Sequence, residues 1–280
     1  MKILLLGCKG MAGNVMRQRL LAKGHTVVGT SRFARQFDNE GIVHFDAMDV
    51  GSWVGFFESQ RCDVVVNCIG ILVQAAERSP HCALTVNTLL PKFLEAFYSR
   101  SETRVIHIST DCVFNGSRGK YTVFDDPDEV TTYGRTKALG EIVNAKDLTI
   151  RTSIIGLELL DKPNAADNCG LLHWVLSQKA GSEVLGFTKC FWSGISTIEL
   201  ADAVLWYLEN PAHGLHQISR EKGISKFDLV SLMSATFAKN LKVEPHSEKS
   251  INKTLVASEG SFPITASYEE MLRRIADSRK

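Results

Sequence analysis

Short apolar runs recur along the first half of the chain, and each is followed by small or polar residues that favour a turn. Runs of this kind are typical of buried parallel strands. Between them lie segments with apolar residues at helical spacing, such as Ala12, Met16 and Leu20. The regular alternation predicts an α/β protein with a Rossmann-type, doubly wound parallel sheet. The predicted strands cover about residues 3–6, 26–30, 43–49, 63–70, 104–108 and 148–153.

The alternation ends near residue 154. Helical patterns dominate the remaining chain, and two of them begin with serine capping boxes at Ser196 and Ser225. We therefore expect a second, smaller C-terminal lobe over the carboxyl edge of the sheet, which would bind the substrate. The expected division is 1–153 with about 191–219 for the nucleotide-binding domain, and 154–190 with 220–280 for the lobe.

Composition narrows the function classes. The 280 residues include 32 basic and 31 acidic ones, so neither nucleic acid nor an anionic membrane is expected as a partner. The seven cysteines have no Cys-x-x-Cys spacing, and we expect free thiols and no metal site. The apolar run at the N-terminus is too short for a secretion signal. We expect a protein of the reducing cytoplasm.

A glycine-rich turn follows the first strand and opens the first helix. Its pattern is Gly7-x-x-Gly10-x-x-Gly13, with Met11 and Ala12 between the last two glycines. Glycines at this place let the backbone approach a pyrophosphate, which then lies on the positive end of the helix. The sequence predicts a dinucleotide site, although a glycine turn in another kind of strand–helix unit is the alternative.

The residues after the second strand indicate which dinucleotide the site prefers. Sites that prefer NAD place a carboxylate here for the ribose 2′-hydroxyl, whereas this chain has Ser31, Arg32 and Arg35. A guanidinium suits a 2′-phosphate, so NADPH is favoured over NAD. The alternative is that Arg32 is a solvated loop residue. After the third strand, Asp46 either accepts a hydrogen bond from adenine or caps the next helix.

Candidate chemistry follows the fifth strand. Ser109 and Thr110 end this strand at the carboxyl edge of the sheet, where ligands bind in such folds. Downstream, the Tyr133-x-x-x-Lys137 spacing places a phenol and an ammonium on one helix face. A nearby ammonium lowers the pKa of a phenol toward the range useful for proton transfer. A solvated Tyr–Lys pair would give the same spacing by chance.

Taken together, these motifs resemble the extended short-chain dehydrogenase/reductase family over the whole chain. The matching segments are the glycine turn, Asn67–Gly70, Ser109–Asp111, Tyr133–Lys137 and Arg151–Ser153. Within the family, the Ser-Thr-Asp-Cys-Val-Phe-Asn-Gly stretch is most similar to that of dTDP-4-dehydrorhamnose reductases. The family resemblance implies an oxidoreductase of nucleotide sugars, with a role in cell-surface polysaccharide synthesis.

The resemblance also implies roles for individual residues. Tyr133 would donate a proton to a sugar C4 carbonyl as NADPH delivers hydride. Lys137 would bind the nicotinamide ribose and lower the pKa of Tyr133, and Thr110 would orient the carbonyl. The expected cofactor contacts are Gly7, Gly10, Met11, Ala12, Gly13, Ser31, Arg32, Arg35, Asp46, Ala47, Cys68, Ile69, Gly70, Ser109, Tyr133 and Lys137.

Two features leave the substrate open. Cys112 stands where the similar reductases have tyrosine, and Phe187–Thr197 lacks their Gly-x-Pro-Thr motif. Dehydration is not expected, because related dehydratases carry Asp-Glu after the threonine and this chain has Asp111-Cys112. A nucleotide-sugar epimerase remains an alternative, as does a non-catalytic NADP-binding subunit like the regulatory subunit of methionine adenosyltransferase. The family also leaves a homodimer open.

Overall fold

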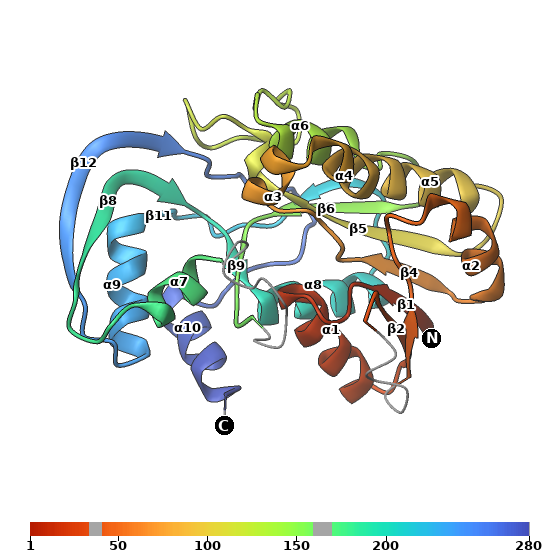
Figure 1. Ribbon diagram of the computed structural model, residues 1–280, viewed down its shortest axis with the longest axis horizontal. Coiled ribbons are helices and arrows are strands. Elements are labelled where there is room, and N and C mark those ends of the chain that lie inside the picture. Colours follow the sequence, from red (N-terminus) through yellow and green to blue (C-terminus); the bar gives the residue numbers. More distant parts are fainter. Residues whose placement is uncertain (34–40, 159–169, 280) are drawn as a thin grey trace.

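A single parallel sheet forms the centre of the molecule (Figure 1). The computed structural model describes residues 1–33, 41–158 and 170–279. Within them, seven strands lie in the order β10-β6-β5-β4-β1-β2-β3, and every neighbouring pair is parallel. The strands are β1 (Lys2–Leu6), β2 (Thr26–Ser31), β3 (Ile42–His44), β4 (Val64–Asn67), β5 (Arg104–Thr110), β6 (Leu148–Thr152) and β10 (Gly214–Gln217). The predicted doubly wound parallel sheet is confirmed.

Successive side chains of a strand point to opposite faces of a sheet, so a continuously apolar strand makes both faces apolar. Ile3 and Leu5 pack on one face, whereas Leu4 and Leu6 pack on the other. Helices α1 (Met11–Ala22) and α8 (Thr197–Glu209) cover the first face. The second face is covered by α2 (Trp53–Ser59), α3 (Val73–Arg78), α4 (Pro80–Ala83), α5 (Leu90–Phe97) and α6 (Thr132–Leu139).

The rest of the chain builds a smaller lobe beside the sheet (Figure 1). Its strands β8 and β12 are parallel, and β11 pairs antiparallel with β8. The lobe consists of α7 (Leu171–Ser177), β8 (Glu183–Trp192), β11 (Ile224–Ser225), α9 (Lys226–Thr236), β12 (Lys242–Asn252) and α10 (Tyr268–Asp277). One apolar core runs from the main sheet through α8 into this lobe. Between the two parts, β7 (Ile154–Ile155) pairs with β9 (Ile195–Ser196).

The structure corrects several sequence-based predictions. The third strand is shorter than predicted, and a π-helical segment, Leu84–Leu89, lies between α4 and α5. Strands β8 and β12 were not predicted at all. Most side chains of β12 are half-buried or exposed, so its sequence carries no apolar stripe.

A buried ion pair ties α6 to the sheet. Arg151 of β6 forms a bidentate bond with Glu141, with Nε–Oε1 and Nη2–Oε2 distances of 2.9 and 2.6 Å. Glu141 also accepts the Ser109 hydroxyl at 2.6 Å, and Arg151 donates to Gln217 at 3.0 Å. The Arg151 guanidinium lies 4.9 Å from the ring centre of Phe114. The network therefore joins three neighbouring strands to the segment that follows α6.

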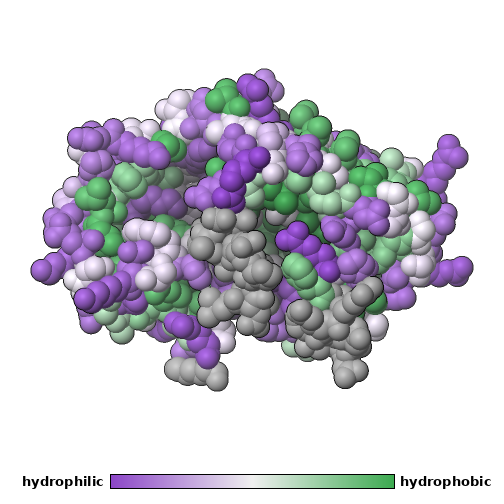
Figure 2. Space-filling view, viewed as in Figure 1, coloured by the Kyte–Doolittle hydropathy of each residue, from purple (hydrophilic) through white to green (hydrophobic). Residues whose placement is uncertain are grey.

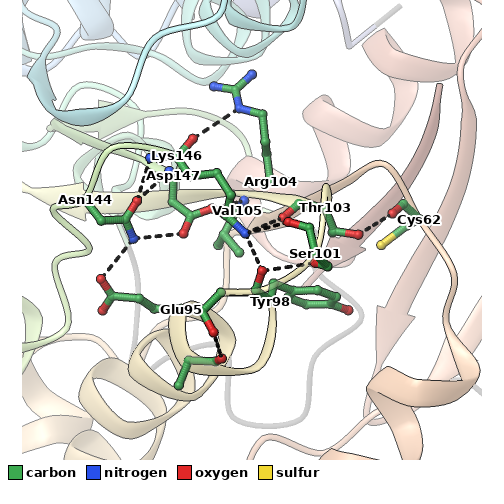
Figure 3. Close-up of polar contacts among 12 residues, drawn as sticks. Cys62, Glu95, Tyr98, Ser101, Thr103, Arg104, Val105, Asn144, Lys146 and Asp147 are labelled. Atoms are coloured by element: carbon green, nitrogen blue, oxygen red, sulfur yellow. Dashed lines mark hydrogen bonds and ion pairs between the residues drawn. The ribbon is translucent and has the colours of Figure 1, made fainter.

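A second polar network closes the amino-terminal end of β5 (Figure 3). The Lys146 ammonium donates to the carbonyl oxygen of Thr103 at 2.9 Å and also to that of Tyr98, which follows α5. Asp147 accepts the backbone N–H of Val105 at 2.8 Å. Carbonyl groups at a helix end need such partners. These bonds hold the end of α5 against the beginnings of β5 and β6.

Hydrophilic side chains cover most of the face shown in Figure 2, and its hydrophobic side chains form separate small patches. Scattered apolar side chains are normal on a protein surface. Among the described residues, none of the helices has the length and hydropathy needed to span a bilayer. Nor do these residues contain a group of three or more His, Cys, Asp or Glu side chains arranged to hold a metal ion.

The buried pair predicts a stability effect. Arg151→Ala should lower the free energy of unfolding by about 3–5 kcal/mol, because Glu141 would remain buried without its partner. The double variant Arg151→Met, Glu141→Leu should lose less, since no charge is then left unpaired. Urea denaturation of the three proteins measures both effects. A single-variant loss below about 1 kcal/mol, the size seen for exposed pairs, would contradict this assignment.

Candidate active site

The sheet order reverses between β1 and β4, and the two turns that follow these strands lie together. Gly7 has a φ of 79°, and a Cβ built on it would lie 2.9 Å from the Ile69 side chain. A Cβ on Gly13 would overlap the Gly7 carbonyl oxygen. Helix α1 begins at Met11, with Gly10 as its N-cap, and no side chain caps its N–H groups. The turn therefore presents backbone N–H donors at the place where such folds bind a pyrophosphate.

Several of the other predicted cofactor residues lie close to this turn, at the start of α1 and after β4. Ala12 is the second residue of α1, and Cys68 to Gly70 follow β4. Burial raises the pKa of the Cys68 thiol to about 12, so the thiol stays uncharged and is not a nucleophile at neutral pH. The structure places the residues at the start of α1 next to those that follow β4, as their positions after neighbouring strands predicted. Their contact with a cofactor remains a prediction.

The adenosine end of the predicted site lies at β2 and β3. Ser31 is the last residue of β2, and its hydroxyl accepts the backbone N–H of Phe33 at 3.1 Å. Arg32 is exposed, and its guanidinium lies 5.2 Å from the Phe33 ring centre. Asp46 accepts the N–H of Met48 at 2.9 Å, so it stabilises the turn after β3, next to the buried Ala47. Arg35 lies outside the described residues.

The three predicted catalytic residues come together beside β5. Thr110 ends this strand, and its hydroxyl accepts the N–H of Cys112 at 3.1 Å and interacts with the Tyr133 hydroxyl. Lys137, one turn after Tyr133 on α6, donates to the carbonyl oxygen of Ile108 at 2.8 Å. All three side chains are buried, with exposed fractions of 4–8%. A solvated Tyr–Lys pair is thereby excluded.

Close backbone packing holds α6 in this position. A Cβ on Gly134 would lie 2.5 Å from the Cys112 carbonyl oxygen, and one on Gly140 would overlap that of Asn87. The Asn87 side chain bonds both backbone groups of Ile71 and the Thr136 hydroxyl, at 2.8–3.2 Å. Asn87 is thus a structural hydrogen-bonding residue. The two glycines were visible in the sequence, but nothing there indicated what they touch.

Burial dominates the electrostatics of Tyr133. It raises the pKa of the phenol well above its ordinary value, with further increases from Cys112 and Asp111, and the interaction with Thr110 only partly opposes the rise. The expected lowering of the Tyr133 pKa by Lys137 is not seen, which corrects our prediction. The phenol is therefore fully protonated at neutral pH. Ser109, a predicted cofactor contact, has its hydroxyl committed to Glu141.

The smaller lobe contributes two lysines that sequence reasoning missed. Lys226 begins α9 and Lys253 follows β12, and both lower the pKa of the buried Asp111 carboxyl, although burial raises it overall. Lys226 also lies over the Trp192 ring, 5.3 Å from its centre. Lys253 forms an ion pair with Glu129 at 2.7 Å. No spacing in the sequence links these lysines to Asp111, because only the lobe's fold brings them to the end of β5.

Comparison with known proteins places this architecture in a family. The family described as "RmlD substrate binding domain" matches residues 1–162, more than half of the chain. The chain belongs to this family. The protein named "Probable low-salt glycan biosynthesis reductase Agl14" of Haloferax volcanii is 28% identical over 229 residues, which span 79% of this chain and 75% of that protein. The dTDP-4-dehydrorhamnose reductase of Mycolicibacterium smegmatis is 35% identical over 144 residues, covering 50% of this chain and 40% of that protein.

Solved structures show the same fold. The dTDP-4-dehydrorhamnose reductase of Bacillus anthracis, solved in complex with NADP, superposes with a TM-score of 0.82 over 99% of both chains at 17% identity. At that identity the likeness establishes the fold alone. Together with the family match, it bears out the resemblance to the extended short-chain reductases that the motifs had indicated.

The glycine turn yields a test of its packing. Gly13→Ala should destabilise the protein by about 1–3 kcal/mol, because the new methyl group meets Gly7 and Cys8 backbone atoms that cannot rotate away. Gly55→Ala is the matched control, since a Cβ there has no neighbour within 4 Å and α2 should gain helix propensity. Chemical denaturation compares the two. Equal stability of both variants would show that the turn has room for a side chain.

Proposed function

We propose that the protein is an NADPH-dependent reductase of the 4-keto group of a nucleotide-linked deoxysugar, acting in the cytoplasm in cell-surface polysaccharide synthesis. The observation that carries this proposal is the meeting of Thr110, Tyr133 and Lys137 at the end of β5, beside the glycine turn. The names of the relatives support it, because they describe reductases of nucleotide sugars and of glycan synthesis.

The residues at the strand ends fit a dinucleotide. The uncapped N-terminus of α1 suits the pyrophosphate, and the absence of any acidic residue from its first turn avoids repulsion. Arg32 is exposed at the end of β2, where it can bind a 2′-phosphate. A bound NADPH supplies the hydride. We propose the residues named from the sequence as the cofactor contacts, with Ser109 contributing through its backbone.

Tyr133 is suited to donate the proton. Because burial keeps its phenol protonated, the group is an acid ready to give a proton to an oxygen that gains negative charge. The Thr110 hydroxyl lies beside it and can hold the same oxygen. This arrangement aligns the carbonyl oxygen between two hydroxyls, which stabilises charge as it develops there.

We propose that the smaller lobe closes the substrate side of this site. Lys226 and Lys253 come from the lobe to Asp111, directly after Thr110. Their positive charges suit a substrate that carries phosphates. Trp192 of β8, whose ring lies under Lys226, is buried, and Lys189 of the same strand is exposed. The division into a cofactor domain and a substrate lobe is part of this proposal.

Replacing the proposed acid should abolish turnover. Tyr133→Phe should reduce the rate of NADPH oxidation with dTDP-4-dehydrorhamnose by about a hundredfold to ten-thousandfold, because the proton donor is lost. NADPH affinity, measured by titration, should change little. In the control Tyr207→Phe, a buried tyrosine of α8 that pairs with His216 is changed and turnover should persist. Equal turnover in wild type and Tyr133→Phe would remove Tyr133 as the acid.

Arg32 should determine the choice of cofactor. Arg32→Ala should cut the preference for NADPH over NADH by about tenfold to hundredfold, as expected for losing a charge-assisted bond of about 1.5–3 kcal/mol. Arg61→Ala is the control, because Arg61 is exposed before β4, at the opposite edge of the sheet. Titration of both nucleotides onto the proteins measures the preference. An unchanged ratio in Arg32→Ala would assign the 2′-phosphate to another residue.

A further inference from the structure

Three buried polar side chains lie end to end beneath the proposed site. Asn67 ends β4, His107 lies within β5, and Lys137 reaches them from α6. Asn67 Nδ2 is 3.2 Å from His107 Nδ1, and His107 Nε2 is 3.4 Å from Lys137 Nζ. Asn67 and His107 are fully buried, and Lys137 is 4% exposed. Neither the glycine turn nor the Thr110–Tyr133 contact explains this chain of contacts.

The backbone determines which way its hydrogens point. The N–H of Ile69 donates to Asn67 Oδ1 at 3.1 Å, which fixes the oxygen of that amide. The amide nitrogen therefore faces His107 Nδ1 and donates to it. A neutral imidazole carries one hydrogen, so with Nδ1 as the acceptor the hydrogen lies on Nε2. Burial, with a smaller contribution from the charge of Lys92, holds the pKa of His107 well below its ordinary value, so the ring is neutral.

The Nε2–H of His107 thus points at Lys137 Nζ. An ammonium has three donors and no acceptor, so it cannot accept this hydrogen. A neutral amine has one lone pair, which can accept the hydrogen of His107 Nε2–H. It also has two hydrogens, one of which is donated to the Ile108 carbonyl oxygen at an Nζ–O distance of 2.8 Å. The amine is the form that satisfies every group in the chain.

We propose that His107, oriented by Asn67, donates Nε2–H to Lys137 and holds it as a neutral amine in the cofactor-free protein. His107 is in this view a positioning residue. Its role in catalysis rests on the proposed function, but the protonation state it sets does not.

The charges around Lys137 agree with this assignment. Burial lowers the pKa of Lys137 to about 8, although Glu141 on its own segment and Cys68 after β4 oppose the change. Glu141 is paired with Arg151, and the Cys68 thiol is neutral. Tyr133, one turn away, is protonated and uncharged. Donation from His107 stabilises only the amine and lowers the Lys137 pKa further.

A lysine that titrates near the working pH can take part in proton transfer. Under the proposed function, Tyr133 loses its proton to the sugar oxygen and becomes a phenolate. The phenolate must then regain a proton from solvent, and a Lys137 that exchanges between ammonium and amine, one turn away on α6, is suited to relay it. An ordinary lysine, charged throughout, would have no such favoured amine state.

NMR of the cofactor-free protein tests the proposal without any turnover. In protein labelled with ¹⁵N-histidine and ¹³C,¹⁵N-lysine, His107 should show the Nε2–H tautomer, and Lys137 should be mainly the uncharged amine at neutral pH. His107→Gln and Lys137→Met identify the two signals. An Nδ1–H tautomer, or a Lys137 that is mainly charged at neutral pH, overturns the proposal.

Asn67→Asp provides a reversal. A carboxylate still accepts the Ile69 N–H but must also accept from His107 Nδ1, which moves the hydrogen and leaves Nε2 to accept from an ammonium. The tautomer should switch, and the Lys137 midpoint should rise by about one pH unit or more. Asn210→Asp is the control, because it adds the same charge at an exposed position after α8, away from His107, and should leave the tautomer unchanged.

An unchanged tautomer in a folded Asn67→Asp protein contradicts the assignment, and the wild-type spectrum decides the question even where a variant does not fold. NADPH turnover, assayed separately, tests the proposed function. If the protein turns over NADPH but Lys137 is charged, only the His107–Lys137 proposal is rejected. If Lys137 is an amine but no turnover is found, only the proposed reductase function is rejected.

Discussion

The bidentate pair between Glu141 and Arg151 fixes where α6 lies on the sheet, and the proposed chemistry depends on that position. Two charges are placed in an apolar interior, so each needs its partner and further hydrogen bonds, which Ser109 and Gln217 provide. The pair has a defined direction, unlike an apolar contact. It therefore holds the residues that directly follow α6 at a defined place on the sheet.

Close packing of α6 has an electrostatic consequence. Gly134 and Gly140 let the helix touch neighbouring backbone, which removes water from Tyr133 and Lys137. Burial disfavours the charged form of each group, so the pKa of the phenol rises and that of the ammonium falls. The close packing that places Tyr133 and Lys137 near each other therefore also favours the uncharged form of both groups. A donor such as His107 then has a large influence, because its hydrogen bond acts where no water competes.

Particular elements show how far sequence reasoning reached. The turns after β1 and β4 were predictable because glycines and small residues after apolar runs have few other uses in a parallel sheet. Strand β12 was not, since Lys242–Asn252 is largely polar and becomes a strand only by pairing with β8. The π-helical segment at Leu84–Leu89 was not predicted either, because its residues fit an ordinary helix.

The sequence by itself determined the sheet, the glycine turn and the residues that carry the proposed chemistry, because apolar periodicity and turn residues act over a few neighbouring positions. Only the tertiary structure decided their protonation and partners. Lys226 and Lys253 reach Asp111 from a distant part of the chain, and Asn67, His107 and Lys137 meet from three separate elements. A pKa depends on burial and on charges within a few ångströms, and neither is a property of neighbours along the chain.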